Sequence, residues 1–158
     1  MKFSNLQLGQ NVEIDPSTSI NNIIIKNNVR IAKRCSIFGG PDNLLEIGEN
    51  TYVGMNTIIN GFVEKVIIGS NVSIAQSVSI ICDSGPNASV RLQRLFPLEK
   101  APIKIGDDCW IGAFSISRRA SNPLATPIQC LAPVNATYSS SNNFTSSPNR
   151  YQPELTTF

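Results

Sequence analysis

Branched aliphatic residues recur every six positions through most of this sequence, and that period limits the possible folds more than any other feature. It does not match the 3.6-residue repeat of an α-helix. Asparagine, glycine and β-branched residues, which are poor helix formers, are also abundant. Six residues can instead form a short strand followed by a turn. The recurring positions are Leu8, Ile14, Ile20, Ile25, Ile31, Ile37, Ile47, Val53, Ile59, Ile68, Ile74, Ile80, Ile105 and Ile111.

Small residues accompany the aliphatic positions in a fixed pattern. The residue after the aliphatic is often Gly or Ala, which we expect to permit a tight corner. The fourth residue after it is small or medium-sized, and it can point inward together with the aliphatic because strand side chains alternate. Three such hexads would close a triangular coil whose copies stack through parallel ladders. The pattern predicts an all-β fold, a parallel β-helix of about five coils over residues 1–113.

The bulk composition excludes several classes of function. A formal net charge of +2 is too small and too scattered to indicate binding to nucleic acid or to an anionic membrane. The four cysteines, Cys35, Cys82, Cys109 and Cys130, have no CxxC spacing, so we expect free thiols in a reducing cytoplasm and no metal site. No signal peptide is visible and no apolar run is long enough to span a membrane, which favours a cytoplasmic location.

One stretch interrupts the regular spacing. The triplets of aliphatic residues start at 8, 25, 47, 68 and 105, and the last step is much longer than the others. The additional residues lie in an excursion over residues 82–102, which reads CDSGPNASVRLQRLFPLEKAP. Long loops carry function more often than regular elements do. We therefore expect the functional residues to lie in this loop or next to it.

The segment Ala101–Ala113, API-x-IGDDCWIGA, follows this loop, and the combination resembles the hexapeptide-repeat O-acetyltransferases of the maltose and galactoside acetyltransferase type. The resemblance implies a left-handed β-helix and a homotrimer with acetyl-CoA in a groove between adjacent subunits. It further implies a saccharide or a similar small hydroxyl acceptor, activated by a histidine at the start of the loop. No metal is implied.

This sequence contains no histidine, so the expected general base is missing. Alignment with different relatives places the family histidine at Gly85 or near Asn87. The candidate catalytic residues are therefore Asp83, as a weak base with an ordinary pKa near 4, and Asn87. The alternative interpretation is that the DSGPN segment is only a turn, because its residue types favour turns.

The resemblance also suggests residues for binding the cofactor. Arg91 and Arg94 would contact the phosphates of acetyl-CoA, while Trp110 and Ala113 of the WIGA segment would lie close to its groove. Each assignment has a simpler alternative. The two arginines would lie on the solvated face of a short amphipathic segment, and Trp110 would pack beneath the loop.

The repeat disappears after Ala113. The next inward aliphatic would fall at 117, where the residue is Ser117, and residues 114–158 contain neither glycine nor lysine. We expect an irregular tail, which is either a genuine divergent segment or the product of a frameshift near codons 114–118. An uncovered last coil would lower solubility unless the tail folds over it. The chain is therefore interpreted either as an acetyl-CoA-dependent O-acetyltransferase or as a non-catalytic β-helix, such as an inactivated copy or a trimer scaffold.

Overall fold

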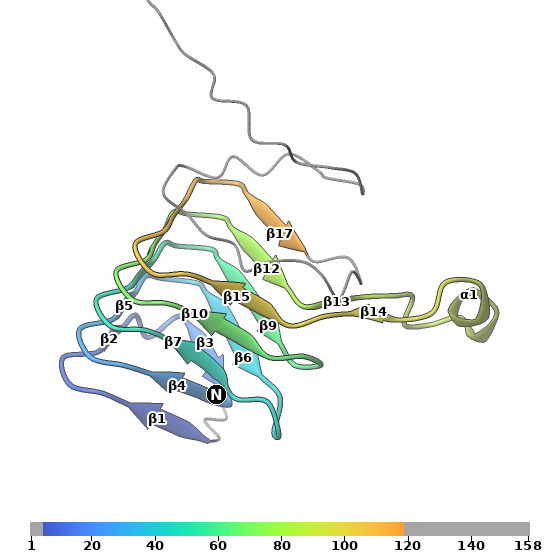
Figure 1. Cartoon of the computed structure of the whole chain (residues 1–158), viewed down its shortest axis with the longest axis horizontal. Helices are drawn as coiled ribbons and strands as arrows, with labels where there is room; N and C mark the ends of the chain where they lie inside the picture. Colours follow the sequence, from blue (N-terminus) through green and yellow to red (C-terminus); the bar gives the residue numbers. More distant parts are fainter. Residues whose placement is uncertain (1–4, 119–158) are drawn as a thin grey trace, which may run out of the picture.

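The computed structural model describes residues 5–118, and the expectations for Cys130 and for the tail beyond residue 118 lie outside that range. The described chain forms a parallel β-helix, as the six-residue period predicts (Figure 1). Three parallel sheets form its sides, and each sheet contains five strands, one from each coil. A separate two-stranded antiparallel ribbon projects from one corner.

Each coil contributes a strand to every sheet in turn. The first sheet contains β1 (Leu6–Leu8), β4 (Ile23–Ile25), β7 (Leu45–Ile47), β10 (Val66–Ile68) and β15 (Ile103–Ile105). The second contains β2 (Glu13–Ile14), β5 (Arg30–Ile31), β8 (Tyr52–Val53), β11 (Ser73–Ile74) and β16 (Trp110–Ile111). The third contains β3 (Ser19–Asn21), β6 (Ser36–Gly39), β9 (Ile58–Gly61), β12 (Ser79–Ile81) and β17 (Ile116–Arg118).

The recurring aliphatic residues form the core, because the ladders hold them in register from coil to coil. Ile25, Ile47 and Ile68 are direct neighbours in the first sheet, and all three are buried. Burial of a side chain of this size stabilises the folded state by roughly 1.5–3 kcal/mol. Two aliphatics of the first coil are exceptions, since Leu8 leaves 53 % of its surface exposed and Ile14 is only partly buried. Among the described residues, only one coil stacks against each of them.

Asparagine dominates the turns between the first and second sheets. Asn11, Asn28, Asn50 and Asn71 each adopt a positive φ of 54–57°. This left-handed conformation is costly for most residues, but asparagine tolerates it well. Their side chains also form a ladder in which each Nδ2 donates to the Oδ1 of the next coil at 3.1–3.2 Å.

The small residue after each aliphatic has a different role from the expected one. The described glycines all have negative or extended φ, so a tight corner is not the reason for the pattern. Instead, a Cβ added at Gly48 would lie 2.4 Å from the backbone carbon of Gly69, and one at Gly54 would lie 2.5 Å from that of Ala75. Glycine is therefore needed at these positions because neighbouring coils approach closely.

The coil continues beyond the expected boundary at residue 113. Strand β17 pairs with β12, and Ser117 stands opposite Ile80, in the ladder position where the pattern called for an aliphatic residue. Backbone hydrogen bonding therefore continues one strand further than the aliphatic pattern.

Within residues 5–118, no helix has the length and apolar character that a membrane crossing requires.

Candidate functional site

The insertions into the regular coils gather at one corner, between the third sheet and the first. Residues 40–44 separate β6 from β7, residues 62–65 separate β9 from β10, and residues 82–102 separate β12 from β15. The last segment is the long excursion between the fourth and fifth coils. Loops on three successive coils thus stand next to one another, and the last is by far the longest, which makes this corner the candidate site.

The excursion folds as an arm that projects well away from the coils (Figure 1). Its stem is an antiparallel ribbon in which β13 (Asp83–Ser84) pairs with β14 (Glu99–Lys100). Its tip is the short helix α1 (Val90–Leu95), whose N-cap Ser89 accepts a hydrogen bond from the backbone N–H of Leu92 at 3.2 Å. Asp83 and Ser84 thus lie in a strand, while the rest of the DSGPN segment leads from that strand toward the helix.

Asp83 lies at the root of the arm and is partly buried. Its Oδ1 accepts a hydrogen bond from Asn60 Nδ2 at 3.1 Å. The Asn60 Oδ1 accepts the backbone N–H of Phe62 at 2.9 Å, which fixes the orientation of the amide. Within residues 5–118, no hydrogen-bond donor contacts the second oxygen of Asp83, Oδ2. The carboxylate is therefore held through one oxygen and is able to accept a proton or a hydrogen bond through the other.

Two further contacts support this root. The side chains of Lys100 and Glu64 form an ion pair at 3.1 Å, which ties the ribbon to the neighbouring loop 62–65. The buried thiol of Cys82 accepts the backbone N–H of Glu64 at 3.3 Å. Burial, as the main cause, raises the pKa of the Cys82 thiol, so the thiol stays protonated and serves as a packing and hydrogen-bonding group.

The other candidates on the arm lie farther out. Asn87 is exposed, and its backbone carbonyl accepts a hydrogen bond from Gln93 Nε2 at 3.3 Å. Arg91 and Arg94 lie on α1, a helix that buries none of its residues. Their guanidinium groups are thus open to solvent, as the simpler interpretation expects, and are also accessible to an anionic ligand.

The structure does not bring Trp110 and Ala113 to the arm of the same chain. Trp110 is on β16, where its register partner is Ser73 and 54 % of its surface is exposed. It does not pack beneath the loop. Ala113 is exposed at the corner between the second and third sheets. The arm rises from a different corner, so these two parts of the expected cofactor site are separated within one chain.

Sequence reasoning missed Asn60, Glu64 and Lys100. Asn60 follows an ordinary inward aliphatic and belongs to no motif, and only the three-dimensional stacking places it beside Asp83. The coincidence of the insertions at one corner was the available signal. Among the described residues, no group of three or more His, Cys, Asp or Glu side chains is placed to hold a metal ion.

Comparison with solved structures identifies proteins of the same fold. The chain is similar to AntD, an N-acyltransferase from Bacillus cereus in complex with dTDP and 3-hydroxybutyryl-CoA, with 23 % identity and a TM-score of 0.60 over 70 % of this chain and 61 % of AntD. A variant of AntD in complex with dTDP-4-amino-4,6-dideoxyglucose and coenzyme A matches with 22 % identity and a TM-score of 0.62, over 72 % of this chain and 64 % of AntD.

At this level of identity the likeness establishes the fold, and the chain spans less than two thirds of the length of AntD. No family model matches the sequence. A search of curated proteins also finds no match.

Proposed function

We propose that this protein transfers an acyl group from an acyl-CoA to a sugar-like acceptor, at the corner from which the arm rises. The observation that carries the proposal is the Asp83 carboxylate, held through one oxygen at the root of the arm. The fold is shared with AntD, whose structures contain 3-hydroxybutyryl-CoA with dTDP or coenzyme A with a dTDP-linked amino sugar. Together these features favour an enzyme over the alternative of a non-catalytic scaffold.

The proposed reaction needs one proton acceptor. The nucleophilic atom of the acceptor attacks the carbonyl carbon of the thioester, and its proton passes to Asp83 Oδ2. The tetrahedral intermediate collapses by breaking the carbon–sulfur bond. The thiolate of coenzyme A leaves and takes the proton from Asp83, so the carboxylate is regenerated. Asn60 acts as a positioning residue because it holds Oδ1 and leaves Oδ2 available to the acceptor.

Binding of coenzyme A requires residues that one chain keeps apart. We assign its phosphates to Arg91 and Arg94 on the exposed helix α1. We assign the groove itself to Trp110 and Ala113 of an adjacent subunit, since both are exposed on other sides of the coils. A homotrimer would bring the arm of one subunit to the second sheet of the next and complete the site.

The acceptor is either a hydroxyl or an amine. O-acetylation from acetyl-CoA is the activity that the sequence resemblance implies. An amine is the second candidate, and the absence of histidine favours it. A carboxylate is a weak base for a hydroxyl, whereas the attacking amine becomes an acidic ammonium as the new bond forms and gives up its proton more readily. Asn87, exposed on the arm, would contact the acceptor in either case.

The test is a comparison of acyl transfer by the full chain and by two matched variants. Release of coenzyme A thiol from acetyl-CoA is followed with amino sugars and with their hydroxyl counterparts. Asp83→Asn should lower the rate by roughly 10²-fold or more while acetyl-CoA still binds. Asp42→Asn is the control, because Asp42 is an exposed carboxylate in the loop 40–44 at the same corner.

If Asp83→Asn and Asp42→Asn both keep the rate of the unmodified chain, Asp83 is not the proton acceptor. Transfer to hydroxyl sugars alone would eliminate the amine candidate. Failure of every sugar to stimulate thiol release, with the fold intact by circular dichroism, would favour the scaffold interpretation.

A further inference from the structure

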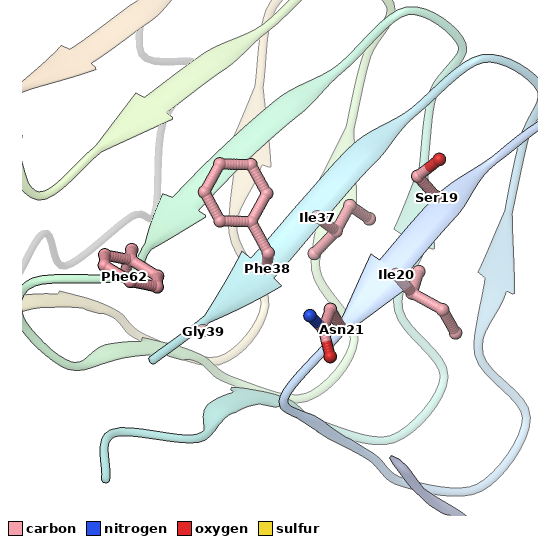
Figure 2. A pocket seen from close by; sticks show the side chains of 7 residues that line it. All are labelled: Ser19, Ile20, Asn21, Ile37, Phe38, Gly39 and Phe62. Carbon is pink, nitrogen blue, oxygen red and sulfur yellow. The ribbon is translucent and has the colours of Figure 1, made fainter. Parts of the chain in front are cut away.

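A pocket lies on the outer face of the third sheet, near the corner that carries the arm. It has a volume of about 410 Å³ and is lined by Ser19, Ile20, Asn21, Ile37, Phe38, Gly39 and Phe62. Figure 2 shows the rings of Phe38, on β6, and Phe62, in the loop after β9, on the same side of the pocket, with Asn21 across from them on β3. A volume of this size suits a small ligand.

The two phenylalanine rings indicate what kind of ligand group would fit. Phe62 leaves 55 % of its surface exposed, although its backbone is held by the hydrogen bond to Asn60. Aromatic side chains at the wall of a pocket favour a planar ring, which stacks on them in an offset or edge-to-face arrangement. Stacking on aromatic side chains is also one of the ways in which proteins hold nucleobases.

The amide of Asn21 adds a polar requirement. Its Oδ1 is buried and has no hydrogen-bond partner within the described part of the chain. Such a group is costly to leave unsatisfied. An asparagine amide carries both a donor and an acceptor, and its two ends exchange by rotation about the last side-chain bond. Asn21 lines the pocket, and a nucleobase edge, which presents both acceptors and donors, can pair with the end of the amide that faces it.

The pocket also lies in line with Asp83. Phe38 is the register partner of Asn60 on the next coil, and Asn60 in turn donates a hydrogen bond to Asp83. Adjacent coils are about 4.8 Å apart, and Asp83 follows the strand two coils beyond Phe38. The separation is therefore roughly 10 Å along the stack. The pentose and diphosphate of a nucleotide sugar bridge a separation of that order.

We propose that this pocket binds the nucleobase of a nucleotide-linked sugar, whose sugar then extends along the row of outward residues to Asp83. The inference rests on the proposed acyl transfer and specifies its acceptor as a nucleoside diphosphate sugar. Phe38 and Phe62 stack on the base, and Asn21 pairs with its edge.

The test is a calorimetric titration of the full chain with dTDP, and with pyrophosphate as a probe that lacks the ring. We expect dTDP to bind and pyrophosphate to bind at least tenfold more weakly. Phe62→Ala should weaken dTDP binding by about tenfold or more. Phe38→Leu is the second variant, because it keeps an apolar side chain on β6 and removes only the ring. Phe114→Ala is the control, since Phe114 is an exposed phenylalanine at a different corner.

Equal binding of dTDP and pyrophosphate would overturn the inference, as would unchanged dTDP binding by Phe62→Ala and Phe38→Leu. Acyl transfer to free sugars by a chain that does not bind dTDP would overturn this site and leave the proposed function standing. Ring-dependent dTDP binding without any acyl transfer would support the pocket and count against the proposed function.

Discussion

The left-handed turn residues show how single side chains determine this fold. Asn50 has a φ of 55°, accepts a hydrogen bond from Asn28 Nδ2 at 3.1 Å and donates one to Asn71 Oδ1 at 3.1 Å. The residue thus supplies both a tolerated backbone conformation and two links between coils. The recurring asparagines of these turns are visible in the sequence. The six-residue pattern was interpreted through its aliphatic and small positions only, so the role of the asparagines was not predicted.

Replacing Asn50 separates these two contributions. Asn50→Ala should lower the free energy of unfolding by about 1–2 kcal/mol, because alanine loses the ladder and is strained at positive φ. Asn50→Gly loses the same hydrogen bonds, but glycine adopts a positive φ without strain. Its loss of unfolding free energy should therefore be smaller than that of Asn50→Ala. Urea unfolding followed by circular dichroism measures both. Equal stability of the two variants would show that the turn does not select for φ.

The buried thiols give a second prediction at the residue scale. Burial raises the pKa of Cys35 and of Cys82. In the unfolded chain each thiol would have a lower pKa and would ionise more readily. The contribution of these thiols to the free energy of unfolding is therefore complete below about pH 8.5 and falls as the pH rises further. At pH 8 both thiols should react with a thiol reagent only after denaturant is added. Rapid labelling of both in the native protein would contradict their burial.

Among the elements, the coils could be predicted from the sequence, whereas the candidate site could be predicted only in part. The six-residue period predicted the strands because their Ile and Val side chains are buried in the core. The interruption of that period predicted the excursion 82–102. The arm's ribbon and helix could not be read from it, since their side chains are mostly exposed and carry no periodic signal. The partnership of Asp83 with Asn60 was equally hidden, because it arises from the stacking of separate coils.

The arm should contribute to function and little to stability. Replacing residues 86–97 by a short Gly-Ser linker keeps the paired strands β13 and β14 and removes α1, which buries no residue. We expect the free energy of unfolding of the separated subunit to change by no more than about 0.5 kcal/mol and acyl transfer to be lost. A shortened protein that transfers acyl groups at the full rate would remove the arm from the account.

For the whole molecule, the separation of the candidate residues predicts an assembly. The arm exposes Val90, Leu92, Leu95 and Phe96, while Trp110 is exposed on the second sheet. Apolar groups in this number favour burial against another chain. Sedimentation equilibrium should give a mass close to three times 17.2 kDa, and a Leu95→Asp, Phe96→Asp double variant should dissociate. If the full chain is monomeric, the arm and Trp110 cannot form one site, and the proposed trimer is wrong.

The most direct test of the central claim is a calorimetric titration of the purified full chain with acetyl-CoA, with thioester consumption followed in the same sample. The account predicts saturable binding, and consumption that depends on an added sugar or amino-sugar acceptor and on Asp83. Absence of any acetyl-CoA binding by the folded chain would contradict the claim that this β-helix is an acyltransferase.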